Sequence, residues 1–68
     1  MADNWKSATA ADVQVGQRVR AAGDELFVSR IESPFMGVPT MVAFIEDTPQ
    51  RWFKRPVMKD AEVEIAQE

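Results

Sequence analysis

The sequence predicts a small all-β domain of about five short strands. Its 68 residues suffice for one domain with a single modest core. Apolar and polar residues alternate with a period of two in several segments, and no window of about eleven residues keeps a helical spacing without a proline. Glycines and prolines separate these segments at short intervals, which is typical of a small β-barrel or β-sandwich.

The predicted strands are residues 13–20, 25–31, 40–45, 51–55 and 61–65. In the first strand Val13, Val15 and Val19 share one parity, and Gly16 interrupts it with an expected bend or bulge. The second strand is dense in β-forming residues. Its apolar residues fall on both parities, so it is either buried on two faces or bulged. The third strand is the most central by composition.

The two flanks of this β region are less regular. Residues 1–11 are small and polar apart from Trp5, so we expect a loosely ordered arm before a domain over residues 12–68. The spacing of Thr9 and Asp12 matches a capping box and leaves room only for a short turn.

We expect Pro56 to limit the fourth strand and the fifth strand to have one apolar and one acidic face.

A chain of this size can bury only a small hydrophobic core. The side chains that we expect to be buried are Val15, Val19, Val28, Ile31, Val42, Phe44, Val63 and Ile65. Such a core supplies only ~3–5 kcal/mol of net stability. The sequence therefore favours good packing, self-association or docking on a partner as additional support.

The residue types that are missing exclude several function classes. The sequence has no Cys, His or Tyr. Disulfides and the usual zinc sites are therefore excluded, and the commonest general base and the best nucleophile are missing. We expect no enzymatic activity, no metal and no cofactor. The acidic pairs Asp24-Glu25 and Glu46-Asp47, and Asp60, show no ligand spacing and are expected to be solvated turn residues.

Charge and hydropathy indicate the compartment and the partners. The net charge of −3 gives no general attraction to phosphate and argues against non-specific nucleic-acid binding. No apolar run approaches the ~20 residues of a membrane helix, and the N-terminus lacks the basic and apolar regions of a secretory signal. The absence of cysteine fits a reducing compartment. We expect a cytoplasmic protein that does not enter a membrane.

The segment Arg51-Trp52-Phe53-Lys54-Arg55 is the densest signal in the chain. In a strand, Arg51, Phe53 and Arg55 share one face, and Trp52 and Lys54 share the other. Cations interleaved with aromatic rings suit single-stranded nucleic acid. The structural alternative is that an aromatic ring fills the core while the cations pair with Glu62 and Glu64 on a neighbouring strand.

Three further arginines extend this hypothesis. The candidate nucleic-acid-binding residues are Arg18, Arg20, Arg30, Arg51, Lys54 and Arg55. If the first, second and fourth strands present one face, these cations gather there and make a dipolar domain. In the alternative, each arginine pairs with a cross-strand glutamate.

The segment 33–39 is the second signal, because Phe35, Met36 and Val38 are apolar and lie between two prolines. Prolines lower the entropy cost of ordering a loop, and Met and Phe are enriched in interface cores. The loop is therefore either a preorganised contact surface or a plug for the open end of a barrel. Trp5 likewise either covers a groove or belongs to a partner contact.

The run Asp12-Val13-Gln14-Val15-Gly16-Gln17-Arg18-Val19-Arg20 resembles the opening of SH3-like barrels of the KOW and Tudor type, in which a short turn leads into V-x-V-G-x-x-V. The segments 42–47 and 51–53 are similar to the third and fourth strands of those barrels around a polar turn. The resemblance covers residues 12–66. It implies a five-stranded SH3-like barrel and carries no ligand specificity.

These observations favour a non-enzymatic protein-interaction or accessory module that docks on a protein partner or on a second copy of itself. The candidate partner-binding residues are Phe35, Met36, Val38 and Trp52. The alternative is a nucleic-acid-associated accessory protein that uses the basic and aromatic strand.

Overall fold

The computed structural model describes residues 4–67. Within that range the elements are β1 (Trp5–Thr9), a 3₁₀ turn (Ala10–Asp12), β2 (Arg18–Ala21), β3 (Asp24–Phe27), β4 (Arg30–Glu32), β5 (Met41–Asp47), β6 (Trp52–Met58) and β7 (Glu62–Ala66). The all-β class is confirmed. The described residues form seven strands where the sequence predicted five.

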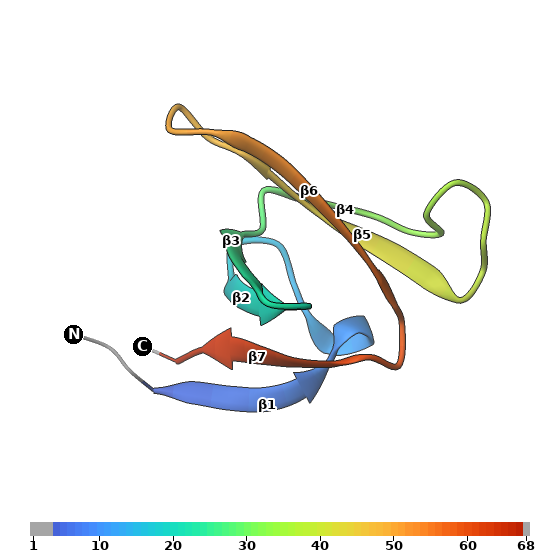
Figure 1. Cartoon of the computed structure of the whole chain (residues 1–68), viewed down its shortest axis with the longest axis horizontal. Coiled ribbons are helices and arrows are strands. Elements are labelled where there is room, and N and C mark those ends of the chain that lie inside the picture. Colours follow the sequence, from blue (N-terminus) through green and yellow to red (C-terminus); the bar gives the residue numbers. More distant parts are fainter. Residues whose placement is uncertain (1–3, 68) are drawn as a thin grey trace.

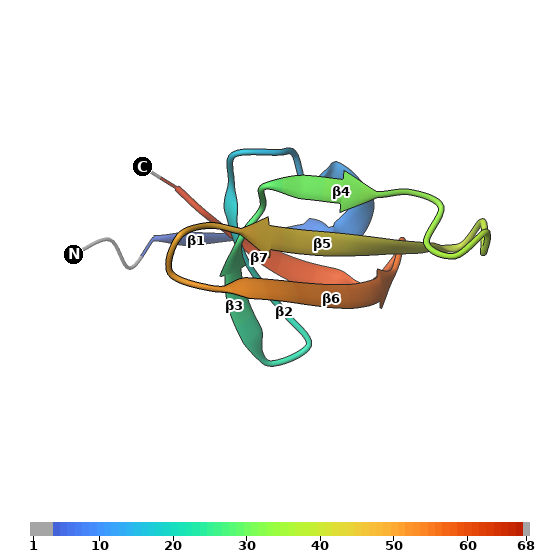
Figure 2. The same cartoon turned by 90° about the horizontal axis from the view of Figure 1, so that it is seen from above.

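The strands form two antiparallel sheets that enclose the core (Figures 1 and 2). One sheet has the order β1-β7-β2-β3 and the other the order β4-β5-β6. The chain crosses from the first sheet to the second between β3 and β4, and it returns between β6 and β7. The site candidates therefore lie either on an outer face of one sheet or where the two sheets meet.

Residues 5–9 differ from the expected loose arm. They form β1, which pairs with β7 from Trp5 opposite Ala66 to Thr9 opposite Glu62. Ala8 packs against the core, but small polar neighbours give the segment too weak an alternation for sequence reasoning to detect. The short turn expected after Thr9 is confirmed, and the Thr9 hydroxyl donates to the Asp12 carboxylate at 3.0 Å. Residues 1–3 of the expected arm lie outside the described residues.

The first predicted strand is shorter than expected. β2 begins only at Arg18, because the chain turns at Gly16, whose φ of 97° is open to glycine at little cost. The turn rotates the preceding residues out of the strand register. Val15 is 61% exposed as a result, and the prediction that it is buried is wrong.

The second predicted strand is two strands in different sheets. β3 ends at Phe27 and β4 begins at Arg30. The connecting Val28 is fully buried, and its backbone N–H donates to the carbonyl of Gln17 at 2.8 Å. This change of sheet explains why apolar residues fall on both parities of the segment.

The fourth predicted strand continues through Pro56 to Met58, so Pro56 does not limit it. Phe44 and Arg55 are opposite each other in the β5–β6 ladder, as are Ala43 and Pro56. Thr40 accepts a hydrogen bond from the N–H of Lys59, and Arg51 accepts one from that of Thr48. By alternation, the position of Pro56 faces away from β5, where the missing N–H costs no ladder bond.

The core contains side chains from both sheets and from the turn after β1. Its buried members are Ala10, Val13, Val19, Ala21, Leu26, Val28, Val42, Phe44, Val57, Val63 and Ile65. Burial is thus confirmed for all the predicted core residues except Val15, which is exposed, and Ile31, which is partly buried against this cluster.

Candidate functional site

The segment Arg51–Arg55 forms one side of a seam between the sheets, where β6 faces the edge of β3. The Arg51 guanidinium donates to the carbonyl of Glu25, and the Arg55 guanidinium pairs with the Asp24 carboxylate. Phe53 packs against the core with the two guanidinium groups 4.9 Å and 5.8 Å from its ring centroid. The predicted shared face of these three residues therefore points inward and joins the sheets.

Glu46 is the buried carboxylate of this seam, with only 7% of its surface exposed. It accepts a hydrogen bond from the backbone N–H of Phe27 at 2.9 Å and another from the Thr48 hydroxyl at 3.0 Å. The Arg51 Nε lies 3.2 Å from the same carboxylate. The prediction that Glu46 is a solvated turn residue is wrong. The missed signal is its parity on β5, which places it on the same face as Val42 and Phe44.

These contacts stabilise the charged form of Glu46. The hydrogen bond from the Phe27 N–H is the largest cause that lowers its pKa below the ordinary value of 4.5, and Thr48 and Arg51 add to it. Burial opposes the shift because desolvation favours the neutral acid. Protein groups thus supply the hydrogen bonds of the carboxylate and keep it ionised. Glu46 therefore has a structural role, in which it links β5 to β3.

The cations predicted to bind nucleic acid are divided between the two sheets, and each contacts a carboxylate. The ion pairs are Arg18–Glu25, Arg20–Glu25, Arg20–Glu64, Arg30–Asp47, Arg51–Glu46, Lys54–Glu32 and Arg55–Asp24. The alternative in which each arginine pairs with a cross-strand glutamate holds in part: Arg18, Arg20 and Arg51 pair with glutamates. Arg30 and Arg55 pair with aspartates. Glu62 and Glu64, the partners of the segment 51–55 in the structural alternative, lie in the other sheet, where Glu64 pairs with Arg20.

The outer face of the β4-β5-β6 sheet carries Trp52 and Lys54, on the parity opposite to that of the seam. Trp52 is 57% exposed and lies opposite Asp47, at the end of the sheet next to the 48–51 turn. Lys54 reaches across β5 to Glu32 at 3.2 Å and lies 5.3 Å from the centroid of the Phe35 ring. Charged groups therefore separate Trp52 from the apolar loop.

The loop 33–40 is a hydrogen-bonded hairpin that projects from the opposite end of the sheet (Figure 2). Phe35 and Val38 pair across the turn made by Met36 and Gly37, whose φ values are 51° and 77°. The N–H of Phe35 donates to the carbonyl of Met41 at 2.9 Å. Positive φ at both central residues is the pattern of a type I′ turn, so the loop has a defined shape.

Apolar side chains gather at this end of the molecule: Met36 and Val38 of the loop are exposed, Phe35 is half-buried, and two residues of the sheet lie nearby. Met41 and Met58 are opposite each other on the outer face, beside the base of the loop. We call Phe35, Met36, Val38, Met41 and Met58 the methionine end. Met36 is 78% exposed and Met58 is 47% exposed. None of the three loop side chains packs against the described core, which counts against the plug alternative.

Trp52 does not belong to this group. It lies at the other end of β6, so the structure brings together only three of the four predicted partner-binding residues. Sequence reasoning missed Met41 and Met58, which reach the same surface through the strand register. The alternation of 41–45 and 52–58 contained the information, but only with the hairpin register known.

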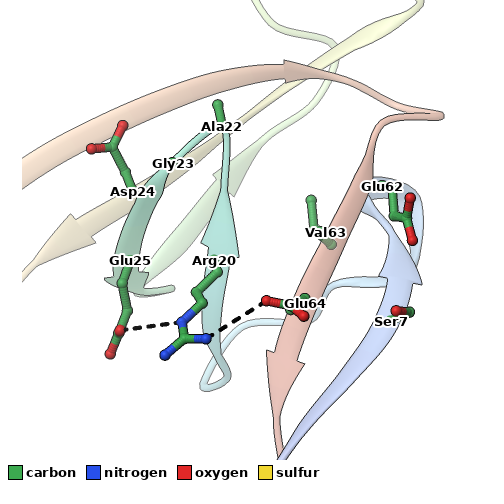
Figure 3. A pocket seen from close by; sticks show the side chains of 9 residues that line it. All are labelled: Ser7, Arg20, Ala22, Gly23, Asp24, Glu25, Glu62, Val63 and Glu64. Atoms are coloured by element: carbon green, nitrogen blue, oxygen red, sulfur yellow. Dashed lines mark ion pairs between the residues drawn. The ribbon is translucent and has the colours of Figure 1, made fainter.

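A groove of about 500 Å³ lies along the first sheet, with Arg20 between Glu25 and Glu64 (Figure 3). The guanidinium is 3.6 Å from Glu25 and 3.7 Å from Glu64, and it stacks on Trp5 at 3.9 Å from the ring centroid. Trp5 therefore supports the arginine that lines the groove. The polar groups of Arg20 are engaged within the chain.

Among residues 4–67 no group of three acidic side chains is arranged to hold a metal ion. No helix in that range is long and apolar enough to cross a membrane. No family model, no curated protein and no solved structure matches the chain.

Proposed function

We propose that this chain is a small, non-enzymatic interaction module on an SH3-like framework, and that it docks a protein partner at its methionine end. The single observation that carries the proposal is the exposure of Met36, at 78%, on a hairpin held by backbone hydrogen bonds. An apolar side chain on a preorganised loop adds interface area at little ordering cost.

The composition of the methionine end supports a protein partner. Methionine is flexible and polarisable, and it adapts to the surface that it meets. Phe35, Met36, Val38, Met41 and Met58 bring one aromatic ring, three thioethers and one branched aliphatic group to one end of the sheet. Clustered apolar anchors of this kind carry most of the energy of a protein interface.

The experiment compares partner capture by the immobilised chain and by the double variant Phe35→Ser/Met36→Ser. Val15→Ser is the matched control, since Val15 is an exposed apolar residue away from this end. We expect mass spectrometry of a native lysate to show a protein that is retained by the wild type and the control and lost with the double variant. Equal retention by all three chains would refute the proposal. Trp52→Ser in the same assay tests whether the far end of β6 contributes.

The melting temperature of the double variant separates an interface from a plug. Exposed substitutions such as Met36→Ser change stability by about 0.5 kcal/mol at most. Phe35 is half-buried but does not pack against the described core, so the loop variant is expected to melt close to the wild type. A loss several times larger, through lost apolar burial, is the result that a plug requires.

The nucleic-acid alternative gains no support from the cations, because each of the six predicted residues contacts a carboxylate. Phosphate binding would have to displace these pairs in a chain of net charge −3. We expect flat fluorescence-anisotropy titrations with short single-stranded and duplex oligonucleotides at roughly 20 mM salt, where screening is weak.

A further inference from the structure

β1 is an edge strand whose outward backbone groups have no partner in the described part of the chain (Figure 1). The N–H of Gln67 donates to the carbonyl of Asn4, and the N–H of Ala10 donates to that of Ala61. Hydrogen-bonded positions alternate along an antiparallel strand, so Lys6 and Ala8 also bond to β7. The N–H and C=O groups of Trp5, Ser7 and Thr9 therefore point away from the sheet. We call these groups the β1 edge.

The other sheet edges are protected. At β3, Glu46 accepts from the N–H of Phe27 and Arg51 donates to the carbonyl of Glu25, so side chains occupy two of the outward backbone groups. At β6, Pro56 faces outward and offers no N–H. β4 is only three residues long. Capping, proline, short length and charged side chains are among the devices by which proteins prevent edge-to-edge pairing.

The β1 edge has no side-chain cap and no proline among its described residues, and it spans five residues, Trp5–Thr9. Its one charge is Lys6, whose backbone groups bond to β7 and do not point outward. From this contrast we propose that β1 pairs antiparallel with β1 of a second copy of the chain, joining two four-stranded sheets into one. The proposal is independent of the methionine end, which lies on the other sheet.

The register of such a pair follows from the outward groups. Ser7 lies on the two-fold axis opposite Ser7 of the second copy, and Trp5 lies opposite Thr9. In this register Lys6 is opposite Ala8, so no like charges meet, and an aromatic residue meets a β-branched one, which is a favourable cross-strand pair. An edge that is complementary to itself in this way fits the isologous interface of a two-fold dimer.

Ser7→Pro tests the proposal without removing a bond of the native ladder. Its missing N–H points outward, as at Pro56, so we expect a folded chain that no longer pairs. Lys6→Pro is the matched control that removes a β1–β7 bond, and we expect it to destabilise the fold. Ser7→Lys is a second variant that leaves the backbone intact and places like charges opposite each other on the axis.

Sedimentation velocity and amide hydrogen exchange by NMR supply the readouts. For the wild type we expect the fraction of dimer to rise with protein concentration up to about 1 mM, since a short strand pair is a small, weak interface. Exchange at Ser7 and Thr9 is expected to slow as the dimer forms, while Lys6 and Ala8 are protected at every concentration. Both Ser7 variants should stay monomeric.

A wild type that stays monomeric over this range, with no change in exchange at Ser7, would overturn the proposal. So would a dimer that both Ser7 variants retain, because it would use another surface. Protection of Ser7 only after another extended peptide is added would also contradict self-pairing. The Phe35→Ser/Met36→Ser variant should dimerise like the wild type, so failure here and failure of the proposed function are distinguishable.

Discussion

The two ends of the β5–β6 hairpin differ in how their side chains are satisfied. Near the 48–51 turn, Glu46 and Arg51 are polar and contact protein groups on the neighbouring sheet. Near the 33–40 loop, Met36 and Met58 are apolar and exposed. The polar end, which looked like a ligand site in the sequence, is engaged in holding the sheets together, and the apolar end is available to a partner.

This contrast shows that residue type alone is a poor guide to function in a small β domain. A basic and aromatic strand suits nucleic acid. Here the side chains of its inward face connect β6 to β3, two strands that belong to different sheets and are not paired with each other. An apolar loop usually folds onto a small core, but here a type I′ turn holds it outward. The satisfied groups are structural, and the exposed ones are candidates for binding.

The largest expected effect comes from the core between the two ends. Phe44→Ala should cost about 3–5 kcal/mol through lost burial and a cavity, because Phe44 is fully buried in the middle of β5. That is comparable to the whole expected stability of so small a core, so circular dichroism should show a largely unfolded chain. Val15→Ala is the exposed control. A melting temperature within about 3 °C of wild type would contradict this placement of Phe44.

At the polar end, Glu46→Ala leaves the Phe27 N–H and the Arg51 guanidinium without their carboxylate. We expect a loss of about 1–3 kcal/mol in urea denaturation. Asp47→Ala is the matched control, since Asp47 is the next residue but its ion pair with Arg30 is half exposed and contributes about 0–1 kcal/mol. Equal losses for the two variants would show that the seam is no more important than a surface pair.

The acid dependence of stability sharpens the same point. The folded pKa of Glu46 is below its ordinary value of 4.5, so near and below pH 4.5 the unfolded chain binds more protons than the folded one. The stabilisation is present above pH 4.5 and is lost as the pH falls through the folded pKa. Glu46→Gln should therefore be less stable than the wild type at about pH 7, and the difference should shrink as the pH falls below 4.5. A difference that is constant with pH would exclude this linkage.

The sequence was sufficient for the class of fold and for most of the core, because period-two alternation reports directly on which side chains face inward. It was insufficient at β1, where Ser7 and Thr9 give no apolar signal, and at residues 25–31, where one continuous apolar run crosses between sheets. It also misassigned Glu46. The errors at β1 and at residues 25–31 have one cause, since the pairing of distant strands depends on long-range register that local pattern does not contain. The Glu46 error has another, because its parity on the third predicted strand was readable and was not used.

The same limit applied to the candidate site. Phe35, Met36 and Val38 were identified because apolar residues in a proline-bounded loop are unusual. Met41 and Met58 were missed because they join the loop only through the β5–β6 register. Trp52 was included because of its residue type, although the register places it at the far end of the hairpin.

The smallest expected effect separates stability from binding at the apolar end. Met36 has a φ of 51° in its turn, and Ala22 has a φ of 53° in the β2–β3 turn. Both are followed by glycine, and asparagine is preferred at this position of a type I′ turn. Met36→Asn and Ala22→Asn should therefore each raise stability by about 0.5–1 kcal/mol, because asparagine tolerates the left-handed conformation better.

Only Met36→Asn should also weaken partner capture, because it removes an exposed thioether, whereas Ala22 lies on the first sheet away from the methionine end. Thermal melting and capture measured on the same two variants give the comparison. If Met36→Asn is more stable and captures the partner as well as Ala22→Asn does, the side chain of Met36 does not contribute to binding. A more stable chain with weakened capture would mean that the strained methionine is retained for contact at the expense of stability.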